Sequence, residues 1–526
     1  MFGKLIEMKK YLIVMVLLIN MVSHQVKAQN PATRVITTTG TLEGAIENGI
    51  RTFKGIAYAK PPVNELRWRE PQPVEKWTGI KKAISFGAGA MQNKIYDDMV
   101  FRSGRFSEDC LYLNIWTPIQ KDNVKLPVLV YFHGGGFTAG DGSEPRYDGE
   151  SMARKDIIMI TINYRMGIFG FFSHPALSGE SIHHASGNYG LLDQNAALKW
   201  VRANILAFGG DPGQVTIAGQ SAGSTSVSLQ MASPLSKGLF RSAIGQSGSI
   251  LNRNPPTSLK DAELIGEKFM KSAGFNSIHD LKKLDAVELL RISTEAKAYF
   301  PITVDGYFLP DLPINIYTMG KQADVPLLAG WTSAEVSNKL VLENADPTVE
   351  NFHVAIKRLY GENAEEIKKH YPVAKDEDVP LVATQLAGDR FAGYSTWKWI
   401  DLHGKTNGKP VYRYLYQQPL PPVVGKEAGY KKGLGAPHSA DIPYGLGNLA
   451  RDKTFAYTDE DYEISRIMQG FFVNFVKTGN PNGEGLPTWS GFQSSIPKVM
   501  MIGGGMKQEP ERFLRRYQYL DQLYYK

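Results

Sequence analysis

The chain has 526 residues and a formal net charge of +7, with 43% hydrophobic and 21% charged residues. This balance is ordinary for a globular protein, and the length is ample for a large hydrophobic core. The lysines and arginines are scattered, with only short pairs and no basic stripe among aromatic residues. The composition therefore argues against a nucleic-acid-binding protein.

The N-terminus has the pattern of a secretory signal peptide. A basic start that includes Lys9 and Lys10 precedes an apolar run over residues 11–21, which is short for a membrane span. Ala28 ends a small-x-small cleavage site, so residues 1–28 are predicted to be removed. The alternative is an uncleaved membrane anchor. We expect a secreted or periplasmic protein without stable membrane insertion after cleavage, with one domain over residues 29–526.

Cys110 is the single cysteine, so the chain cannot form an internal disulfide. It lies in a stretch with the pattern of a strand, where a buried small hydrophobic residue is favoured over a reactive thiol.

The first part of the chain, residues 34–116, is rich in strand-forming residues and interrupted by prolines. It predicts antiparallel strands and loops that lead onto a main sheet. Residues 86–105 have no clear period and predict a long surface loop, a kind of segment that often acts as a lid.

The middle of the chain alternates between strands and helices. Apolar runs predict buried strands at residues 128–132, 157–162, 215–218 and 243–246, and a helical stripe covers residues 188–208. This alternation predicts a mostly parallel sheet with helices on both faces.

The C-terminal half adds two mainly helical segments, residues 259–298 and 349–402. We expect these insertions above the carboxyl-terminal edge of the sheet, where ligands bind in such folds. Further strands are predicted at residues 325–329, 411–416 and 498–502, and an amphipathic helix at residues 463–477.

The stretch Gly219-Gln220-Ser221-Ala222-Gly223 places a serine between a predicted strand and a predicted helix. Small residues on both sides suit a sharp turn in which backbone atoms crowd together. The turn would expose the Ser221 hydroxyl at the top of the sheet, beside the Ala222 amide at a helix N-terminus. For this motif alone, a glycine-rich turn without a catalytic role is the alternative.

His438 is the best candidate for the base that a serine nucleophile needs. It lies in a loop beyond the predicted strand at residues 411–416, whereas His353, His370 and His403 lie in predicted helices. The alternative is a hydrogen-bonded loop histidine.

Glu335 is the best candidate for the acid that orients this base, because it follows the strand at residues 325–329 by a few positions. Asp324 precedes that strand and would lie at its other end, and Asp305 lies in a predicted turn. A surface ion pair is the alternative role for Glu335.

A glycine run, His133-Gly134-Gly135-Gly136-Phe137, follows the strand that ends at Phe132. Glycines let backbone N–H groups approach a substrate oxygen closely. We expect an oxyanion hole formed by the amides of Gly135, Gly136 and Ala222. The alternative is a merely flexible loop.

Several segments together resemble the type-B carboxylesterase family, which includes the cholinesterases. They are Phe208-Gly209-Gly210-Asp211-Pro212 with the serine motif, Glu108-Asp109-Cys110-Leu111-Tyr112-Leu113-Asn114, Asn163-Tyr164-Arg165, Asn188-Tyr189-Gly190-Leu191-Leu192-Asp193-Gln194, Gln246-Ser247-Gly248 and Asp441-Ile442-Pro443-Tyr444. The matches run from about Gly40 to Trp489, which is nearly the whole mature chain.

The resemblance implies an α/β-hydrolase fold, ester hydrolysis by Ser221, Glu335 and His438, and a deep gorge lined by aromatic and apolar side chains. The sequence departs from the family pattern in two places. The cysteine partner that Cys110 would have in the family is missing, so no disulfide is expected to tie down the loop at residues 86–105. The surroundings of Glu335 lack the family's usual Asn- and Gly-containing form, and Trp331 is expected to line the pocket.

We therefore predict a secreted carboxylic ester hydrolase that acts on a small-molecule ester through an acyl-enzyme, without metal or organic cofactor. One alternative is a serine hydrolase that acts on amides, polyesters or a conjugated natural product, because the same triad serves all of these. The other is a non-catalytic binding or adhesion module. The acyl chain, the alcohol, the stereopreference and the oligomeric state are left open.

Overall fold

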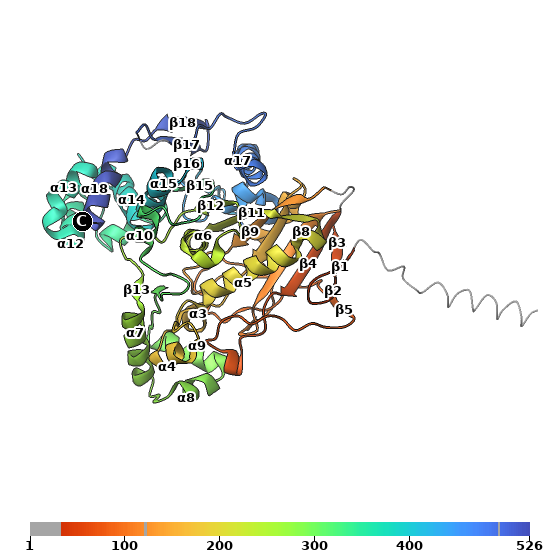
Figure 1. Ribbon diagram of the computed structural model, residues 1–526. Helices are drawn as coiled ribbons and strands as arrows, with labels where there is room; N and C mark the ends of the chain where they lie inside the picture. The colour runs from red at the N-terminus through yellow and green to blue at the C-terminus, as the bar shows by residue number, and fades with distance from the viewer. Residues whose placement is uncertain (1–32, 120–123, 493–494, 526) are drawn as a thin grey trace, which may run out of the picture.

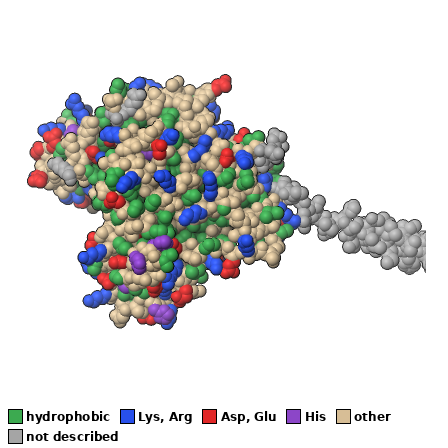
Figure 2. Space-filling model, viewed as in Figure 1, with side chains coloured by type: hydrophobic (Ala, Val, Ile, Leu, Met, Phe, Trp, Pro, Cys, Tyr) green, Lys and Arg blue, Asp and Glu red, His purple; other side chains and the backbone are tan. Residues whose placement is uncertain are grey.

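The structure, a computed structural model, describes residues 33–119, 124–492 and 495–525. The predicted signal peptide, residues 1–28, lies outside these residues. Within them, no helix combines the length and the apolar character needed to cross a bilayer. On the face shown in Figure 2, basic and acidic side chains are interspersed.

An eleven-stranded sheet crosses the middle of the molecule in the order β18-β17-β16-β15-β12-β11-β9-β10-β8-β4-β3 (Figure 1). Its strands are β3 (Ala45–Glu47), β4 (Ile50–Ala57), β8 (Tyr112–Pro118), β9 (Leu126–Phe132), β10 (Ile158–Ile162), β11 (Gly210–Gln220), β12 (Ser242–Gln246), β15 (Leu327–Thr332), β16 (Val411–Tyr416), β17 (Lys498–Ile502) and β18 (Lys507–Pro510). The strands from β10 to β17 run parallel, and the N-terminal strands β3, β4 and β8 pair antiparallel. This mixed arrangement confirms the predicted sheet.

Both faces of the parallel strands are buried, which explains why these strands appear as continuous apolar runs. In β9, Val128, Val130 and Phe132 face one core, and Leu129 and Tyr131 face the other. The first core is covered by α5 (Tyr189–Asn204), α6 (Ala222–Ala232), α10 (Pro313–Thr318) and α15 (Tyr394–Thr406), and the second by α2 (Glu150–Ala153), α16 (Ile442–Leu446) and α17 (Asp459–Thr478).

The helical insertions form two groups beside the sheet (Figure 1). One group contains α4 (Pro175–Glu180), α7 (Leu259–Ser272), α8 (Ile278–Lys283) and α9 (Ala286–Glu295). The other contains α12 (Val349–Tyr360), α13 (Ala364–His370), α14 (Val379–Gly388) and α18 (Leu514–Tyr524), together with the short α11 (Lys339–Leu342) and a π-helical turn η9 (Asp389–Gly393) that joins α14 to α15.

In the described part of the chain, a small three-stranded sheet and two strand pairs lie outside the main sheet. They are β1 (Arg34–Ile36), β2 (Thr41–Glu43) and β5 (Ile80–Lys82), then β6 (Gly89–Ala90) with β7 (Phe106–Ser107), and β13 (Thr257–Ser258) with β14 (Thr303–Val304). The β6–β7 pair closes the base of the predicted loop at residues 86–105.

One strand of the main sheet was not expected from the sequence. The last strand expected from the sequence covers residues 498–502, but β18 pairs antiparallel with β17 and forms the sheet's edge. Its sequence, Lys507-Gln508-Glu509-Pro510, is polar and ends in proline. An edge strand pairs on one side only, so it needs neither the apolar run nor the full set of backbone donors that reveal a central strand.

Candidate active site

Ser221 lies on a strained turn between β11 and α6. Its backbone angles are φ 57° and ψ −121°, a conformation that residues other than glycine rarely adopt. The Ser221 N–H donates a 2.8 Å hydrogen bond to the carbonyl of Gln246, which ties the turn to β12. A Cβ atom on Gly223 would lie 2.0 Å from the carbonyl oxygen of Phe132, so glycine is required there by close approach to β9.

His438 and Glu335 meet in the loops that follow the adjacent strands β16 and β15. Nδ1 of the His438 ring lies 2.5 Å from Oε2 of Glu335. The backbone N–H of His438 also donates a hydrogen bond to the backbone carbonyl of Glu335 at 3.1 Å. The N–H of Thr332 donates to Oε1 of the same carboxylate at 2.8 Å. Since the carboxylate can only accept hydrogen bonds, this geometry places the proton of the neutral imidazole on Nδ1 and leaves Nε2 as its hydrogen-bond acceptor.

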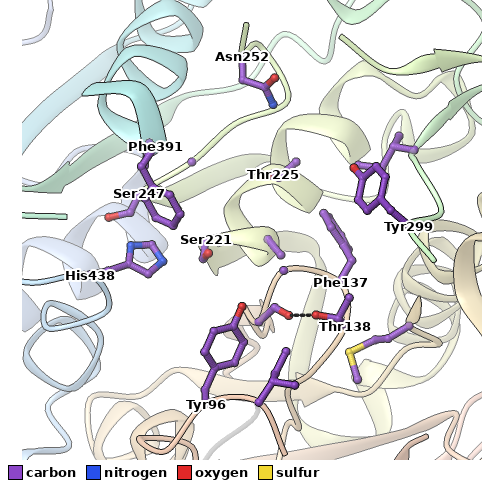
Figure 3. Close-up of a pocket in the computed structure, with 18 of the residues that line it drawn as sticks. Tyr96, Phe137, Thr138, Ser221, Thr225, Ser247, Asn252, Tyr299, Phe391 and His438 are labelled. Carbon is purple, nitrogen blue, oxygen red and sulfur yellow. Dashed lines mark hydrogen bonds between the residues drawn. The ribbon is translucent and has the colours of Figure 1, made fainter. Parts of the chain in front are cut away.

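All six residues singled out by the sequence line one cavity of about 1490 Å³. They are Ser221, Glu335, His438, Gly135, Gly136 and Ala222. In Figure 3 the imidazole of His438 and the side chain of Ser221 face the same space. Within the described residues, the Ser221 hydroxyl makes no hydrogen bond, and the Gln220 amide nitrogen lies 2.9 Å from Nε2 of His438.

The glycine loop after β9 is held by its carbonyl groups. The Gly135 carbonyl accepts from the N–H groups of Thr138 and Ala139 at 3.1 and 3.0 Å, and the Phe137 carbonyl accepts from Gly167 at 2.7 Å. By contrast, the N–H groups of Gly135 and Gly136 have no partner in the described part of the chain. The first residue of α6, Ala222, likewise has no helical acceptor for its N–H.

His133 supports this loop from the interior. Burial lowers its pKa to about 4, so the ring is neutral at physiological pH. The ring stacks on Tyr164 with 4.4 Å between centroids, and the Tyr164 hydroxyl donates to the His133 carbonyl at 2.7 Å. The loop therefore rests on a rigid, uncharged platform.

Aromatic residues that the sequence did not single out surround the serine. Figure 3 shows Tyr96, Phe137, Tyr299 and Phe391 around the cavity. They come from four separate segments. Phe137 ends the glycine run that the sequence marks, whereas no local pattern marks Tyr299 or Phe391 as a cavity residue. Tyr96 lies in the predicted loop at residues 86–105, which supplies one wall of the cavity.

The expectation for Trp331 is wrong. Its ring is 4% exposed and lies outside the cavity lining, where Arg413 and Tyr517 pack against it. Trp331 is on β15, so its side chain points into the core, whereas Glu335 lies beyond the strand end. Side chains alternate between the two faces of a strand, so a residue within β15 such as Trp331 faces a core, whereas Glu335, which lies beyond the strand, can reach the cavity.

The other histidines of the C-terminal half, and Cys110, lie outside the cavity lining. His403 is fully buried and its Nε2 lies 2.9 Å from the Val325 carbonyl. His353 and His370 are on α12 and α13, outside the cavity lining. Cys110 is buried, and burial raises the pKa of its thiol well above the usual value.

The sheet order, the strand-to-helix serine turn and the positions of the acid and histidine at successive strand ends define an α/β-hydrolase. The sequence model of the carboxylesterase family matches residues 31–519. The chain therefore belongs to the carboxylesterase family and is a carboxylic ester hydrolase, which favours an enzyme over the alternative of a binding module.

Relatives and solved structures agree with this assignment. The chain is 33% identical to a fumonisin B1 esterase of Sphingopyxis macrogoltabida, over 87% of this chain and 84% of that protein. It is 32% identical to a para-nitrobenzyl esterase of Bacillus subtilis, over 89% and 94%. The crystal structure of the Geobacillus stearothermophilus carboxylesterase EST55 superimposes with a TM-score of 0.79 at 33% identity, covering 93% of this chain and 99% of that one.

Proposed function

We propose that this chain hydrolyses carboxylic esters with Ser221 as nucleophile, His438 as general base and acid, and Glu335 as the group that orients His438. The observation that carries the proposal is the 2.5 Å contact of His438 with Glu335 in a cavity that Ser221 also lines. The nucleophile, the base and the orienting acid are supplied by separate loops at one edge of the sheet.

The reaction would proceed in two halves. Nε2 of His438 takes the proton from the Ser221 hydroxyl as its oxygen attacks the ester carbonyl carbon, and the resulting tetrahedral intermediate collapses. The bond to the alcohol oxygen breaks, that oxygen receives the proton from Nε2, and the acyl group stays on Ser221. A water molecule, deprotonated by Nε2 of His438, then attacks the acyl carbon. The bond to the Ser221 oxygen breaks, that oxygen takes the proton back from Nε2, and the carboxylic acid is released.

The amides of Gly135, Gly136 and Ala222 would hold the negative oxygen of each tetrahedral intermediate. Support comes from their position in the cavity lining and from the absence of acceptors for the Gly135 and Gly136 amides in the described residues. Donors that are fixed before the reaction and free of partners stabilise such an oxygen without reorganising.

The decisive experiment replaces the nucleophile. Ser221→Ala should lower the rate of hydrolysis of p-nitrophenyl butyrate by roughly 10⁴–10⁶ while leaving the circular dichroism spectrum unchanged. A fluorophosphonate should label Ser221 in the native enzyme and in the control Ser337→Ala, which changes another serine of the cavity lining. An active or labelled Ser221→Ala enzyme would refute the proposed nucleophile.

We also propose that residues 1–28 direct export and are removed. The support is the sequence pattern of a basic start, an apolar run and a cleavage site ending at Ala28. Mass spectrometry of the protein recovered outside the cytoplasm should find a mature chain that begins at Gln29. A cell-associated chain that retains residues 1–28 would contradict this.

A further inference from the structure

The cavity has an unbalanced set of charges. Two carboxylates line it, Glu335 and Asp98, and both are paired: Glu335 with His438, and Asp98 with Arg146 at 3.0 Å. Two further arginines, Arg253 and Arg390, also line the cavity. Within the described residues, neither of them makes an ion pair or a side-chain hydrogen bond, so the wall of the cavity carries two positive charges without a protein counter-charge, one half-buried (Arg390) and one exposed (Arg253).

Both arginines border the cavity near the C-terminal end of α18. Arg390 is half-buried on η9, and its guanidinium lies over the ring of Tyr360 at 5.2 Å. Arg253 is exposed, and the carbonyl of the preceding residue, Asn252, accepts a 2.7 Å hydrogen bond from the hydroxyl of Tyr525, the residue that follows α18. Tyr524 and Tyr360 face each other with 3.5 Å between their hydroxyl oxygens.

This part of the cavity wall is continuous with the site of chemistry. Arg390 directly precedes Phe391, whose ring contacts His438, and Arg253 follows Asn252, which borders the cavity in Figure 3. A substrate seated on Ser221 could therefore extend along the cavity wall toward Arg253 and Arg390. Guanidinium groups bind carboxylates through charge-assisted and often paired hydrogen bonds.

We propose that Arg253 and Arg390 form a subsite for a carboxylate of the substrate, so that the enzyme prefers esters with an anionic group remote from the scissile bond. This proposal rests on the proposed function, because the anion is placed relative to Ser221. Neutral esters of the same length fill the cavity without compensating the two arginines, and they lack this contribution to binding.

The test compares anionic and neutral esters of matched length. The p-nitrophenyl monoesters of adipic, suberic and sebacic acids carry a free carboxylate, and their methyl-capped counterparts are neutral. A second series places the carboxylate on the alcohol, as butyrate esters of hydroxy acids and of their methyl esters, with hydrolysis followed by titration of the released acid. In at least one series, kcat/KM should be higher for the anionic member at a preferred length, and added salt should reduce the advantage.

Variants assign this preference to the two arginines. Arg253→Gln and Arg390→Gln should each lower the anionic-to-neutral ratio of kcat/KM by about 3–10-fold, and the double variant should abolish the preference. Arg390→Lys, which keeps the charge, should retain part of it. The control Arg512→Gln removes an exposed arginine outside the cavity lining and should leave the ratio unchanged.

The outcomes separate this proposal from the proposed function. Normal hydrolysis of neutral esters shows that each variant is folded and that the catalytic groups work. If the native enzyme shows no preference for the anionic member in either series, or if the double variant retains the native ratio, the carboxylate subsite is refuted while ester hydrolysis by Ser221 stands. Loss of all activity in Ser221→Ala concerns the nucleophile alone.

Discussion

The ring of Phe391 packs edge-on against the imidazole of His438, with 4.9 Å between centroids and 87° between the planes. Phe391 belongs to η9, where the Asp389 carboxylate accepts hydrogen bonds from the hydroxyls of Tyr371 and Tyr517 at 2.8 and 2.9 Å. Tyr517 is on α18, so the C-terminal helix helps to hold the turn that places an aromatic ring against the proposed base.

Replacing this ring should impair the orientation of His438. Phe391→Ala is expected to lower kcat for p-nitrophenyl acetate by about 10-fold, because misplacing a reacting group by a fraction of an ångström is costly. The small acyl group limits any direct contact with residue 391. Phe391→Leu, which keeps most of the volume, serves as the control; equal kcat values for native and Phe391→Ala enzymes would contradict the positioning role.

Glu335→Gln should remove the acceptor that fixes the imidazole tautomer and stabilises its cation. By analogy with acid-to-amide changes in serine triads, kcat should fall by about 10³–10⁴. The amide has nearly the same shape, so the unfolding midpoint in urea should change little. A fall in kcat smaller than 10-fold in steady-state assays would exclude Glu335 as the orienting acid.

The two glycines of the proposed oxyanion hole should respond differently to alanine. A Cβ on Gly135 would lie 2.0 Å from the Ala139 carbonyl oxygen, and its φ of 109° disfavours any side chain. A Cβ on Gly136 would meet its nearest atom, the Tyr96 hydroxyl, at 3.4 Å, with a left-handed φ of 63° that costs about 1 kcal/mol. Gly135→Ala should lower kcat/KM by about 10²–10³, as loss of a donor does.

Gly136→Ala is the matched control and should lower kcat/KM by less than about 10-fold, provided its N–H stays in place. Both variants are assayed with the same p-nitrophenyl ester and checked by circular dichroism. An equal loss in both, or a larger loss in Gly136→Ala, would contradict the described loop geometry.

Asp441 predicts a pH dependence of stability. It is fully buried, its carboxylate accepts from the Tyr414 hydroxyl at 2.7 Å, and burial raises its pKa from 3.8 to about 6. The folded protein therefore holds the proton more tightly than the unfolded chain, so this group's contribution to stability is largest at low pH and is lost as pH rises through about 6.

Asp441→Asn should remove this loss. The free energy of unfolding of the variant relative to the native protein should increase by about 2 kcal/mol between pH 4 and pH 7, because one pKa unit corresponds to about 1.36 kcal/mol and the unfolded carboxyl is already partly ionised at pH 4. Urea unfolding at a series of pH values measures the difference. A difference that stays constant over this range would contradict the raised pKa.

Local sequence determined much of this protein. Buried strands in the middle of the chain are visible as apolar runs, because parallel strands covered on both faces need such residues throughout. The serine turn can also be recognised in the sequence. Because the backbone of β9 crowds position 223, only glycine fits there, and this requirement produces a short glycine-containing motif around Ser221. Ser221 and Glu335 closely follow β11 and β15, and His438 lies in a longer loop after β16, so the order of elements is enough to expect these positions from the sequence.

Only the tertiary structure decided which distant side chains share the cavity. Glu335 and His438 are 103 positions apart and meet because β15 and β16 are adjacent and parallel. No local pattern in the sequence reveals the edge contact of Phe391 or the burial of Trp331. The same is true of Arg253 and Arg390, which have no acidic partner among the residues that the structure describes. The periodicity of a sequence indicates on which face of its own strand or helix a residue lies. Which residues of other elements it contacts depends on how those elements pack together.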